Sequence, residues 1–339
     1  MRILQTGQFW HGSDCLHIAR AWEAEGAIVR RVPDETLFPD WRGRALRGVR
    51  RVLRPALRRA WNARLLAEAR LFQPDVVFIA NAHECAPQTV RALRTDGRRV
   101  MCFYHDAELY AHSRFLACVS EFDLVASPCW WHKERFEEVG AQAVMQVRYG
   151  YDPEAHQPVR LGERERAIYS ADIVFVGSHW LPRAEAFAAL IGRDFAHRLT
   201  LWGGRWGLLP TGSPLRACWR GREIHDGELR YVYGGAKAAI QWVKVGDQHN
   251  PRTFQIAACG GAILVAQRTE EHQAFFREDV EAVFFEGVEE LRDKLNFWLR
   301  DDQEAARERM AAAARERCLA EDYGYRPVVR RYAAFFAGG

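Results

Sequence analysis

Long apolar runs and paired cysteines are both missing from this sequence of 339 residues. No apolar run approaches the roughly 20 residues that a helix needs to cross a bilayer, which argues against membrane-spanning helices. Residues 1–4 predict a strand and leave no room for a signal peptide. The eight cysteines form no CxxC pair and lie mostly beside apolar residues, which is typical of buried free thiols rather than of disulfides or a zinc site. We therefore expect a cytoplasmic protein.

A strong charge imbalance is missing as well. Lysine and arginine number 48 against 44 for aspartate and glutamate, and the net charge is +4. The overall charge therefore gives no indication of a nucleic-acid-binding protein. Apolar residues, in contrast, make up 48% of the chain, enough for two domain cores at this length.

Short apolar runs alternate with helical patterns along the whole chain. Strands are expected at residues 2–6, 30–32, 74–80, 100–104, 124–126 and 144–148, and again at 172–176, 199–202, 238–242, 262–265 and 282–285. Because helices separate these strands, the sequence predicts parallel α/β sheets in both halves. A linker-like stretch places the boundary near residue 155, between domains 1–155 and 156–322.

The most informative stretch is 247–265, DQHNPRTFQIAACGGAILV. It predicts a polar loop, a helix opened by Pro251, a glycine turn at 260–261 and a buried strand. The start of this helix presents backbone N–H groups and the positive end of the helix dipole, with Arg252 beside them. We predict a phosphate-binding position here.

A second loop of the same kind follows the strand at 172–176. It contains Gly177 and Ser178, and Arg183 stands at the start of the next helix. Backbone N–H groups and a guanidinium together can hold a phosphate. The following strand ends in a Gly-Gly-Arg-Trp turn that contains Arg205.

These motifs resemble those of the CgeB-like (spore-maturation-protein-type) glycosyltransferases, relatives of the family-4-like group with the GT-B fold. The matching positions are Asn250, Arg252, Thr253, Phe254, the run Ala258-Cys259-Gly260-Gly261, the Val-Gly-Ser at 176–178 with Arg183, and the glycine-tryptophan turn around Arg205. The resemblance covers the second half well and the first half in general plan.

The resemblance implies an α/β fold of the GT-B type, with two doubly wound Rossmann-like domains whose parallel sheets face each other across a cleft. Residues 156–322 would bind the nucleotide-sugar donor, and residues 1–155 would bind the acceptor. Residues 323–339 resemble the terminal helix that crosses back onto the N-terminal domain in this fold.

One pair of positions departs from the family pattern. The wider group has two acids separated by seven residues, and here the two positions hold Asp247 and Gln255. The resemblance implies that the first faces the donor sugar and that the second holds the ribose. An amide oxygen accepts a hydrogen bond less strongly than a carboxylate does. The glutamine therefore bears on donor affinity or donor type.

The chemistry expected of such a site needs no metal. No Asp-X-Asp pair in a loop suggests a metal site, and Arg183, Arg205, Lys244 and Arg252 can stabilise a leaving diphosphate. No cofactor is expected apart from a nucleotide-diphosphate sugar as donor substrate, and the sequence does not indicate its base.

On the acceptor side, five polar residues follow predicted strands of the first half: His11, His83, Glu84, His105 and Asp106. Each could act as a general base if the reaction inverts the anomeric centre. Family-4-like relatives usually retain the configuration, and we expect retention. For Asp106 an equally good interpretation is a cap on the next helix.

Residues 42–64 contain nine arginines and no acid, with apolar residues at helical spacing. Such a helix can contact an anionic membrane or an acidic acceptor. The alternative is a solvated arginine face that covers a domain core.

The leading hypothesis is a glycosyltransferase that acts on a polysaccharide, lipid-linked or protein acceptor. A sugar-nucleotide epimerase would need acids and bases on both sides of the donor sugar, and Asp247 with Gln255 offers one acid. A catalytically degenerate GT-B protein that serves as a binding or scaffold subunit is the other alternative, because Gln255 replaces the ribose-binding carboxylate.

Overall fold

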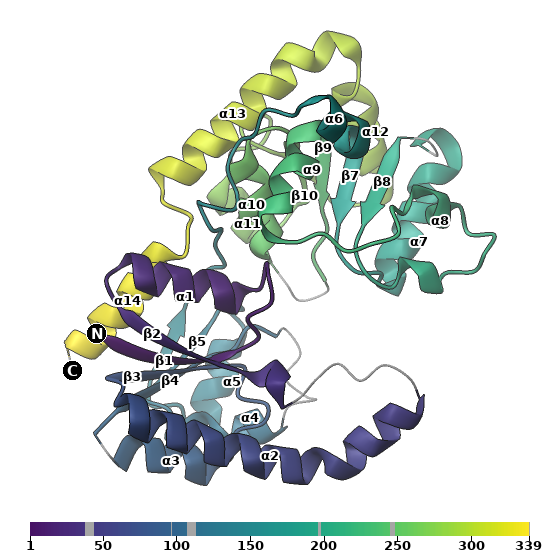
Figure 1. Ribbon diagram of the computed structural model, residues 1–339. Coiled ribbons are helices and arrows are strands. Elements are labelled where there is room, and N and C mark those ends of the chain that lie inside the picture. The colour runs from purple at the N-terminus through teal and green to yellow at the C-terminus, as the bar shows by residue number, and fades with distance from the viewer. Residues whose placement is uncertain (38–43, 96, 107–112, 196–197, 245–247, 339) are drawn as a thin grey trace. The chain divides into compact units, whose positions relative to one another are not determined.

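The computed structural model describes residues 1–37, 44–95, 97–106, 113–195, 198–244 and 248–338 (Figure 1). The chain divides into two compact units: Met1–Arg148 together with Tyr325–Gly339, and Tyr149–Gly324. The chain thus leaves the first unit a few residues before the expected boundary at residue 155.

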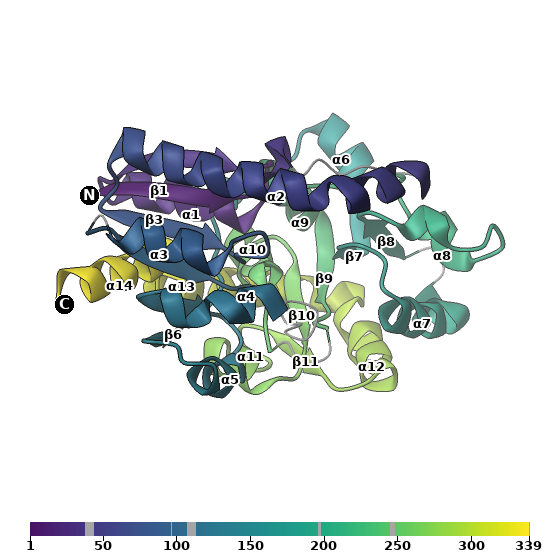
Figure 2. The same cartoon turned by 90° about the horizontal axis from the view of Figure 1, so that it is seen from below.

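The first unit contains a six-stranded parallel sheet in the order β2-β1-β3-β4-β5-β6. Its strands are β1 (Arg2–Gly7), β2 (Ile28–Pro33), β3 (Val76–Ala80), β4 (Arg99–Phe103), β5 (Leu124–Ser127) and β6 (Val144–Gln146). Its helices are α1 (Asp14–Ala24), α2 (Arg44–Phe72), α3 (Pro87–Thr95), α4 (Ser113–Cys118), α5 (His132–Glu138) and α14 (Arg326–Ala337), with short 3-10 turns η1 (Asp34–Thr36) and η2 (Val119–Glu121). Helix α2 runs along the sheet and extends past β1 and β3 (Figures 1 and 2).

The C-terminal helix α14 packs against α1 in the first unit. Arg326 and Arg330 both donate hydrogen bonds to the Glu25 carboxylate at the end of α1. Tyr332 is fully buried and lies next to Trp22 of α1. The last residues of the chain therefore complete the core formed by the first ones.

The second unit contains a five-stranded parallel sheet in the order β11-β10-β9-β7-β8. Its strands are β7 (Ala171–Val176), β8 (Leu199–Trp202), β9 (Ala236–Gln241), β10 (Ile263–Gln267) and β11 (Val283–Phe285). Its helices are α6 (Glu163–Tyr169), α7 (Leu181–Leu190), α8 (Pro214–Cys218), α9 (Leu229–Gly235), α10 (Pro251–Cys259), α11 (Glu270–Phe275), α12 (Val288–Trp298) and α13 (Glu304–Ala320). The shorter turns are η3 (Ile191–Phe195), η4 (Trp206–Leu208), η5 (Asp226–Glu228) and η6 (Asp301–Gln303).

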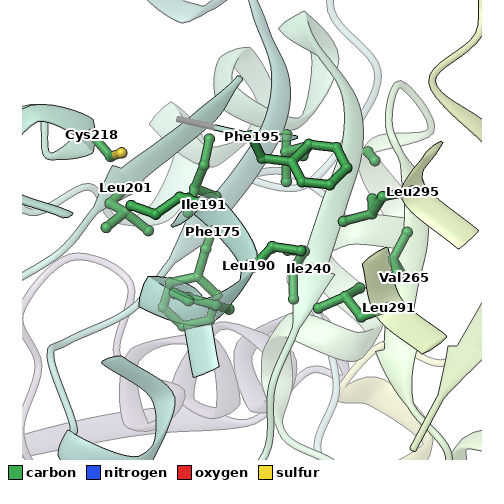
Figure 3. Close-up of a cluster of buried hydrophobic side chains, with 14 of the residues drawn as sticks. Phe175, Leu190, Ile191, Phe195, Leu201, Cys218, Ile240, Val265, Leu291 and Leu295 are labelled. Atoms are coloured by element: carbon green, nitrogen blue, oxygen red, sulfur yellow. The ribbon is translucent and has the colours of Figure 1, made fainter. Parts of the chain in front are cut away.

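The core of the second unit forms where strand side chains meet the helices that cover the sheet. Phe175, Ile240 and Val265 come from three neighbouring strands, and Leu190 and Leu291 come from α7 and α12 (Figure 3). All five side chains are at most 1% exposed. The strands are buried on both faces, which is why they read as continuous apolar runs in the sequence.

The predicted fold class is confirmed: both sheets are parallel and are built from strands that alternate with helices. Each expected strand corresponds to one of β1 to β11. The sequence pattern does not predict α4, α6 or α8, which are short helices. All eight cysteines are buried free thiols, as predicted. Within the described ranges, no helix combines the length and apolar content that crossing a bilayer requires.

Candidate active site

The loops after β7 and β8 pack tightly against each other at the carboxyl ends of these strands. The backbone N–H of Gly177 donates to the Trp202 carbonyl at 2.8 Å, and the Trp206 indole donates to the Gly177 carbonyl at 2.8 Å. Gly203 has a φ of +138°, and a Cβ atom there would lie 2.1 Å from the Gly177 oxygen. Because no side chain fits at this position, a glycine is required for the two loops to meet.

Arg252 stands beside this loop. A Cβ atom built on Gly177 would lie 2.8 Å from the Phe175 ring and 3.6 Å from Cζ of Arg252, so the guanidinium lies next to this loop. Arg252 belongs to the first turn of α10, a helix of nine residues. Two motifs that were predicted separately as phosphate-binding, the Gly177 loop and the start of α10, are therefore neighbours in the second unit.

Asn250 caps α10. Its side-chain oxygen accepts a hydrogen bond from the Arg252 backbone N–H at 3.0 Å, and its backbone is extended, as is usual for an N-cap. This cap fixes where the helix begins. The predicted position of Asn250 at the helix start is therefore correct, while its side chain acts on the helix itself.

The Thr253 side chain makes hydrogen bonds in the interior of the second unit. Its side chain is fully buried, and its hydroxyl lies 3.1 Å from the Gln241 amide nitrogen and 2.9 Å from Nε2 of His272. Nδ1 of His272 in turn lies 2.7 Å from the Gln267 carbonyl. The Thr253 hydroxyl thus makes its hydrogen bonds in the interior, and a contact of this residue with a donor stays a prediction.

The direction of this hydrogen-bond chain follows from the protonation of His272. Burial lowers the pKa of His272 to about 4, so the ring is neutral near pH 7. Because a carbonyl can only accept, Nδ1 carries the proton and Nε2 accepts from the Thr253 hydroxyl, which accepts from the Gln241 amide. The chain joins α10 to the ends of β9 and β10.

The Arg183 side chain also makes its contacts inside the second unit. Its side chain is 3% exposed and stacks over the Phe175 ring at 4.7 Å. The guanidinium donates to the Ser178 carbonyl at 2.9 Å and to the Trp242 carbonyl at 3.0 Å. Arg183 therefore holds the loop after β7 against the segment after β9, and its contact with a phosphate stays a prediction.

Ser178 and Arg205 are both exposed at the ends of β7 and β8. Arg205 has a left-handed backbone with a φ of 68°, which is uncommon for a residue with a side chain. Its guanidinium makes no ion pair with the described residues. Both positions are open to a ligand at this edge of the sheet.

Gln255 lies one turn after Arg252, so the two side chains leave α10 on the same face. It is 5% exposed, and its amide makes no hydrogen bond within the described part of the chain. Asp247, the other member of the predicted pair, lies outside the described residues.

His249 is a residue of this region whose role the sequence analysis missed. It is 3% exposed, its Nδ1 pairs with the Glu271 carboxylate, and its Nε2 accepts from the Tyr149 backbone N–H at 3.0 Å. It fixes the segment before α10 to the beginning of the second unit. The signal that could have revealed it is a histidine directly before the Asn-Pro helix start.

In the first unit, polar side chains gather at the ends of β3 and β4. Asn81 accepts from the His105 backbone N–H at 2.9 Å, and its amide nitrogen lies 3.0 Å from Nε2 of His105. Nε2 of His83 lies 2.8 Å from the Asp106 carboxylate. His105 and Asp106, which are adjacent in the chain, thus lie beside Asn81 and His83, whereas His11 is exposed in the loop after β1.

Burial determines the protonation of this group. It lowers the pKa of His105, which is therefore neutral near pH 7. At the end of β2, burial raises the pKa of Asp34 to about 7, and its carboxylate accepts a hydrogen bond from the Trp61 indole at 2.9 Å. Asp34 was missed in the sequence, although an acid after a predicted strand at 30–32 could have suggested it.

A known family matches the part of the chain that contains these residues of the second unit. Residues 183–334 match the model of a family described as glycosyl transferase-like. This segment is similar to a glycosyl transferase-like domain. It covers most of the second unit, with Arg252 and Gln255, and the C-terminal helix. No curated protein matches the sequence.

Solved structures with the same fold span the whole chain. HepE from Anabaena in complex with UDP-glucose has 12% identity and a TM-score of 0.64, covering 100% of this chain and 99% of that one. Sucrose-phosphate synthase from Thermosynechococcus elongatus has 15% identity and a TM-score of 0.67, with 100% of both chains covered. A trehalose-6-phosphate synthase analysed for glycosyl transfer with retention has 11% identity and a TM-score of 0.64, covering 100% and 99%.

These likenesses show the fold, that of the GT-B glycosyltransferases. Together with the matched domain, they agree with the enzyme class predicted from the sequence, a glycosyltransferase.

Proposed function

We propose that the protein transfers a sugar from a nucleotide-diphosphate sugar to a polysaccharide, lipid-linked or protein acceptor, as a CgeB-like enzyme. The observation that carries the proposal is the closeness of Arg252 to the Gly177 loop: its Cζ would lie 3.6 Å from a Cβ atom built on Gly177. A glycine loop, a helix N-terminus and a guanidinium at one sheet edge form a binding position for a diphosphate.

The reaction breaks the bond between the anomeric carbon and the donor diphosphate, and an acceptor hydroxyl oxygen takes its place. The proton of that hydroxyl leaves, and the nucleotide diphosphate departs with the bonding electrons. Arg252, the N–H groups at the start of α10 and Arg205 would stabilise the negative charge that develops on the diphosphate. A well-aimed donor in such a site contributes roughly 3 kcal/mol, so the transfer needs no metal.

Gln255 would meet the donor ribose, because it shares a face of α10 with Arg252. HepE was solved with UDP-glucose, which makes UDP the first nucleotide to test. The likeness to a synthase that acts with retention supports retention of configuration here as well.

On the acceptor side, we assign His105 and the His83–Asp106 pair to contacts with the acceptor hydroxyl. His83 and Asp106 lie 2.8 Å apart, close enough to share a proton. Eight buried free thiols support a reducing compartment, the cytoplasm.

The proposal is tested by nucleotide binding. Thermal shift and calorimetry are run with UDP, GDP, dTDP, ADP and CMP, with and without Mg²⁺. Saturation at 100 times Kd raises the free energy of unfolding by roughly 2.7 kcal/mol. Binding of one nucleotide without metal, lost in Arg252→Ala and kept in Arg309→Ala on the exposed side of α13, supports the transferase. If none binds, the degenerate scaffold alternative replaces it, with Gln255 as the reason.

A further inference from the structure

Helix α2 carries two apolar faces, and the core of the first unit uses one of them. Trp61, Leu65 and Ala69 are at most 2% exposed and belong to that core. At 3.6 residues per turn, these three positions fall on one side of the helix. This face explains why the C-terminal half of α2 packs on the sheet.

The second apolar face lies on the opposite side and belongs to the N-terminal half. Val49 is 47% exposed, Val52 is 78% exposed and Leu53 is 41% exposed. With Ala56, these residues are three, four and seven positions apart, which is the spacing of a single helical stripe. We call them the α2 stripe. The part of the helix that bears the stripe extends past the sheet (Figures 1 and 2).

Four arginines in this part of α2 differ in their partners. Arg54 and Arg58 pair with Glu84, which holds the middle of the helix to the first unit. Arg51 and Arg59 are exposed and pair with no acid in the described ranges. The helix therefore offers positive charge that the protein itself does not neutralise.

We propose that the α2 stripe docks on the surface of a bilayer that contains anionic lipid. Exposed aliphatic side chains flanked by arginine match the boundary between acyl chains and anionic headgroups. The segment 42–64 has nine arginines and no acid, so its charge is complementary to such a surface, apart from Arg54 and Arg58, which pair with Glu84. Docking would bring the first unit to acceptors carried by the membrane.

Sedimentation of the full chain with lipid vesicles tests this proposal. Vesicles that contain phosphatidylserine bind the protein at low ionic strength and release it as salt rises, whereas pure phosphatidylcholine vesicles do not bind it. Arg51→Gln with Arg59→Gln lowers the partition coefficient about 30-fold, from ~1 kcal/mol per arginine near the surface. Val52→Ser with Leu53→Ser lowers it about tenfold through lost apolar burial.

Two substitutions on the same helix serve as matched controls. Leu71→Ser removes an aliphatic side chain that is 83% exposed, and Arg70→Gln removes an exposed arginine, both far from the stripe. Neither changes the partition coefficient. All variants alter exposed positions, so equal thermal unfolding shows that each is folded.

Three results would overturn the proposal. These are failure to bind phosphatidylserine vesicles at low salt, equal binding to both vesicle types, or an α2 stripe that joins two copies of the chain. An α2 stripe that joins two copies is recognised by two results together: the protein does not bind vesicles, and Val52→Ser with Leu53→Ser converts its dimer into a monomer. Because no nucleotide is added, these outcomes leave the proposed transferase activity unaffected.

Discussion

Arg252 combines two features in one residue: its backbone lies in the first turn of α10 and its guanidinium stands beside Gly177. Both point to a diphosphate, and they can be separated by substitution. Arg252→Ala lowers nucleotide affinity about 100-fold, as expected for a lost charged donor in a site of this kind. Arg252→Lys keeps the charge without the two-pronged geometry, and the loss is roughly tenfold. Calorimetry checks both values, and equal affinities for the two variants would speak against a guanidinium clamp.

Gln255 is the residue where this chain departs from the family pattern. A carboxylate accepts the ribose hydroxyls about twice as strongly as an amide does, so Gln255→Glu raises nucleotide affinity roughly fivefold. The same titration of wild type and variant measures the effect. A weaker complex in Gln255→Glu would show that this position faces a negative group rather than the ribose.

Asp34 makes the stability of the first unit depend on pH. Burial raises the pKa of Asp34 to about 7, well above its value in an unfolded chain, with Glu35, Glu84 and His83 nearby. The folded state therefore holds the proton of this carboxyl more tightly than the unfolded chain does. The stability that this contributes is complete below about pH 3.9 and is lost as the pH rises through the pKa of the folded state. Asp34→Asn is therefore as stable as wild type near pH 4.

At pH 8 the same variant is more stable than wild type by about 2 kcal/mol, which allows for partial solvent access to the carboxyl. Urea unfolding at several pH values measures the difference. Asp301→Asn, on an exposed position, should show none. A difference for Asp34→Asn that does not change with pH would exclude the titration of this carboxyl as its cause.

At the scale of elements, α10 depends on side chains that lie under it. Thr253→Val keeps the shape of the side chain but leaves the buried Gln241 amide and Nε2 of His272 without the hydroxyl between them. The expected loss in free energy of unfolding is about 3 kcal/mol for two buried polar groups. Thr253→Ser, which keeps the hydroxyl, loses about 1 kcal/mol for the missing methyl. Equal stability of the two variants would contradict the hydrogen-bond chain.

The elements themselves were largely predictable because their signals are local. Each strand is a short apolar run, and α10 has both a proline start and a glycine end. Helix α6 was missed because its seven residues include none that is buried, so no apolar periodicity marks it. Short helices with one buried turn give the same weak signal.

The roles of Arg183 and Thr253 could not be predicted from the sequence, because their partners are distant in the chain. Arg183 binds the carbonyl of Trp242, 59 residues away, and Thr253 binds His272, 19 residues away. A motif shows which residue types stand together, but not whether a guanidinium faces a ligand or a carbonyl. The contact of Gly177 with Arg252 likewise required the folded unit.

At the scale of the whole molecule, the C-terminal helix packs against the first helix of the chain. Helix α14 returns to α1, and Glu25 binds both Arg326 and Arg330. The first unit therefore requires residues from both ends of the sequence, while the second unit is one continuous segment. Donor binding is assigned to the continuous segment and membrane docking to the first unit, so the two proposals can be tested on the same protein without interference.

The central claim is that the Gly177 loop and Arg252 support sugar transfer without a metal. The most direct measurement is release of nucleotide diphosphate from UDP-glucose and other nucleotide sugars by the purified full chain in EDTA. We expect release that EDTA does not reduce and that Arg252→Ala lowers at least 100-fold, while Arg309→Ala leaves it unchanged. Release that stops in EDTA, or equal release by wild type and Arg252→Ala, would contradict the account.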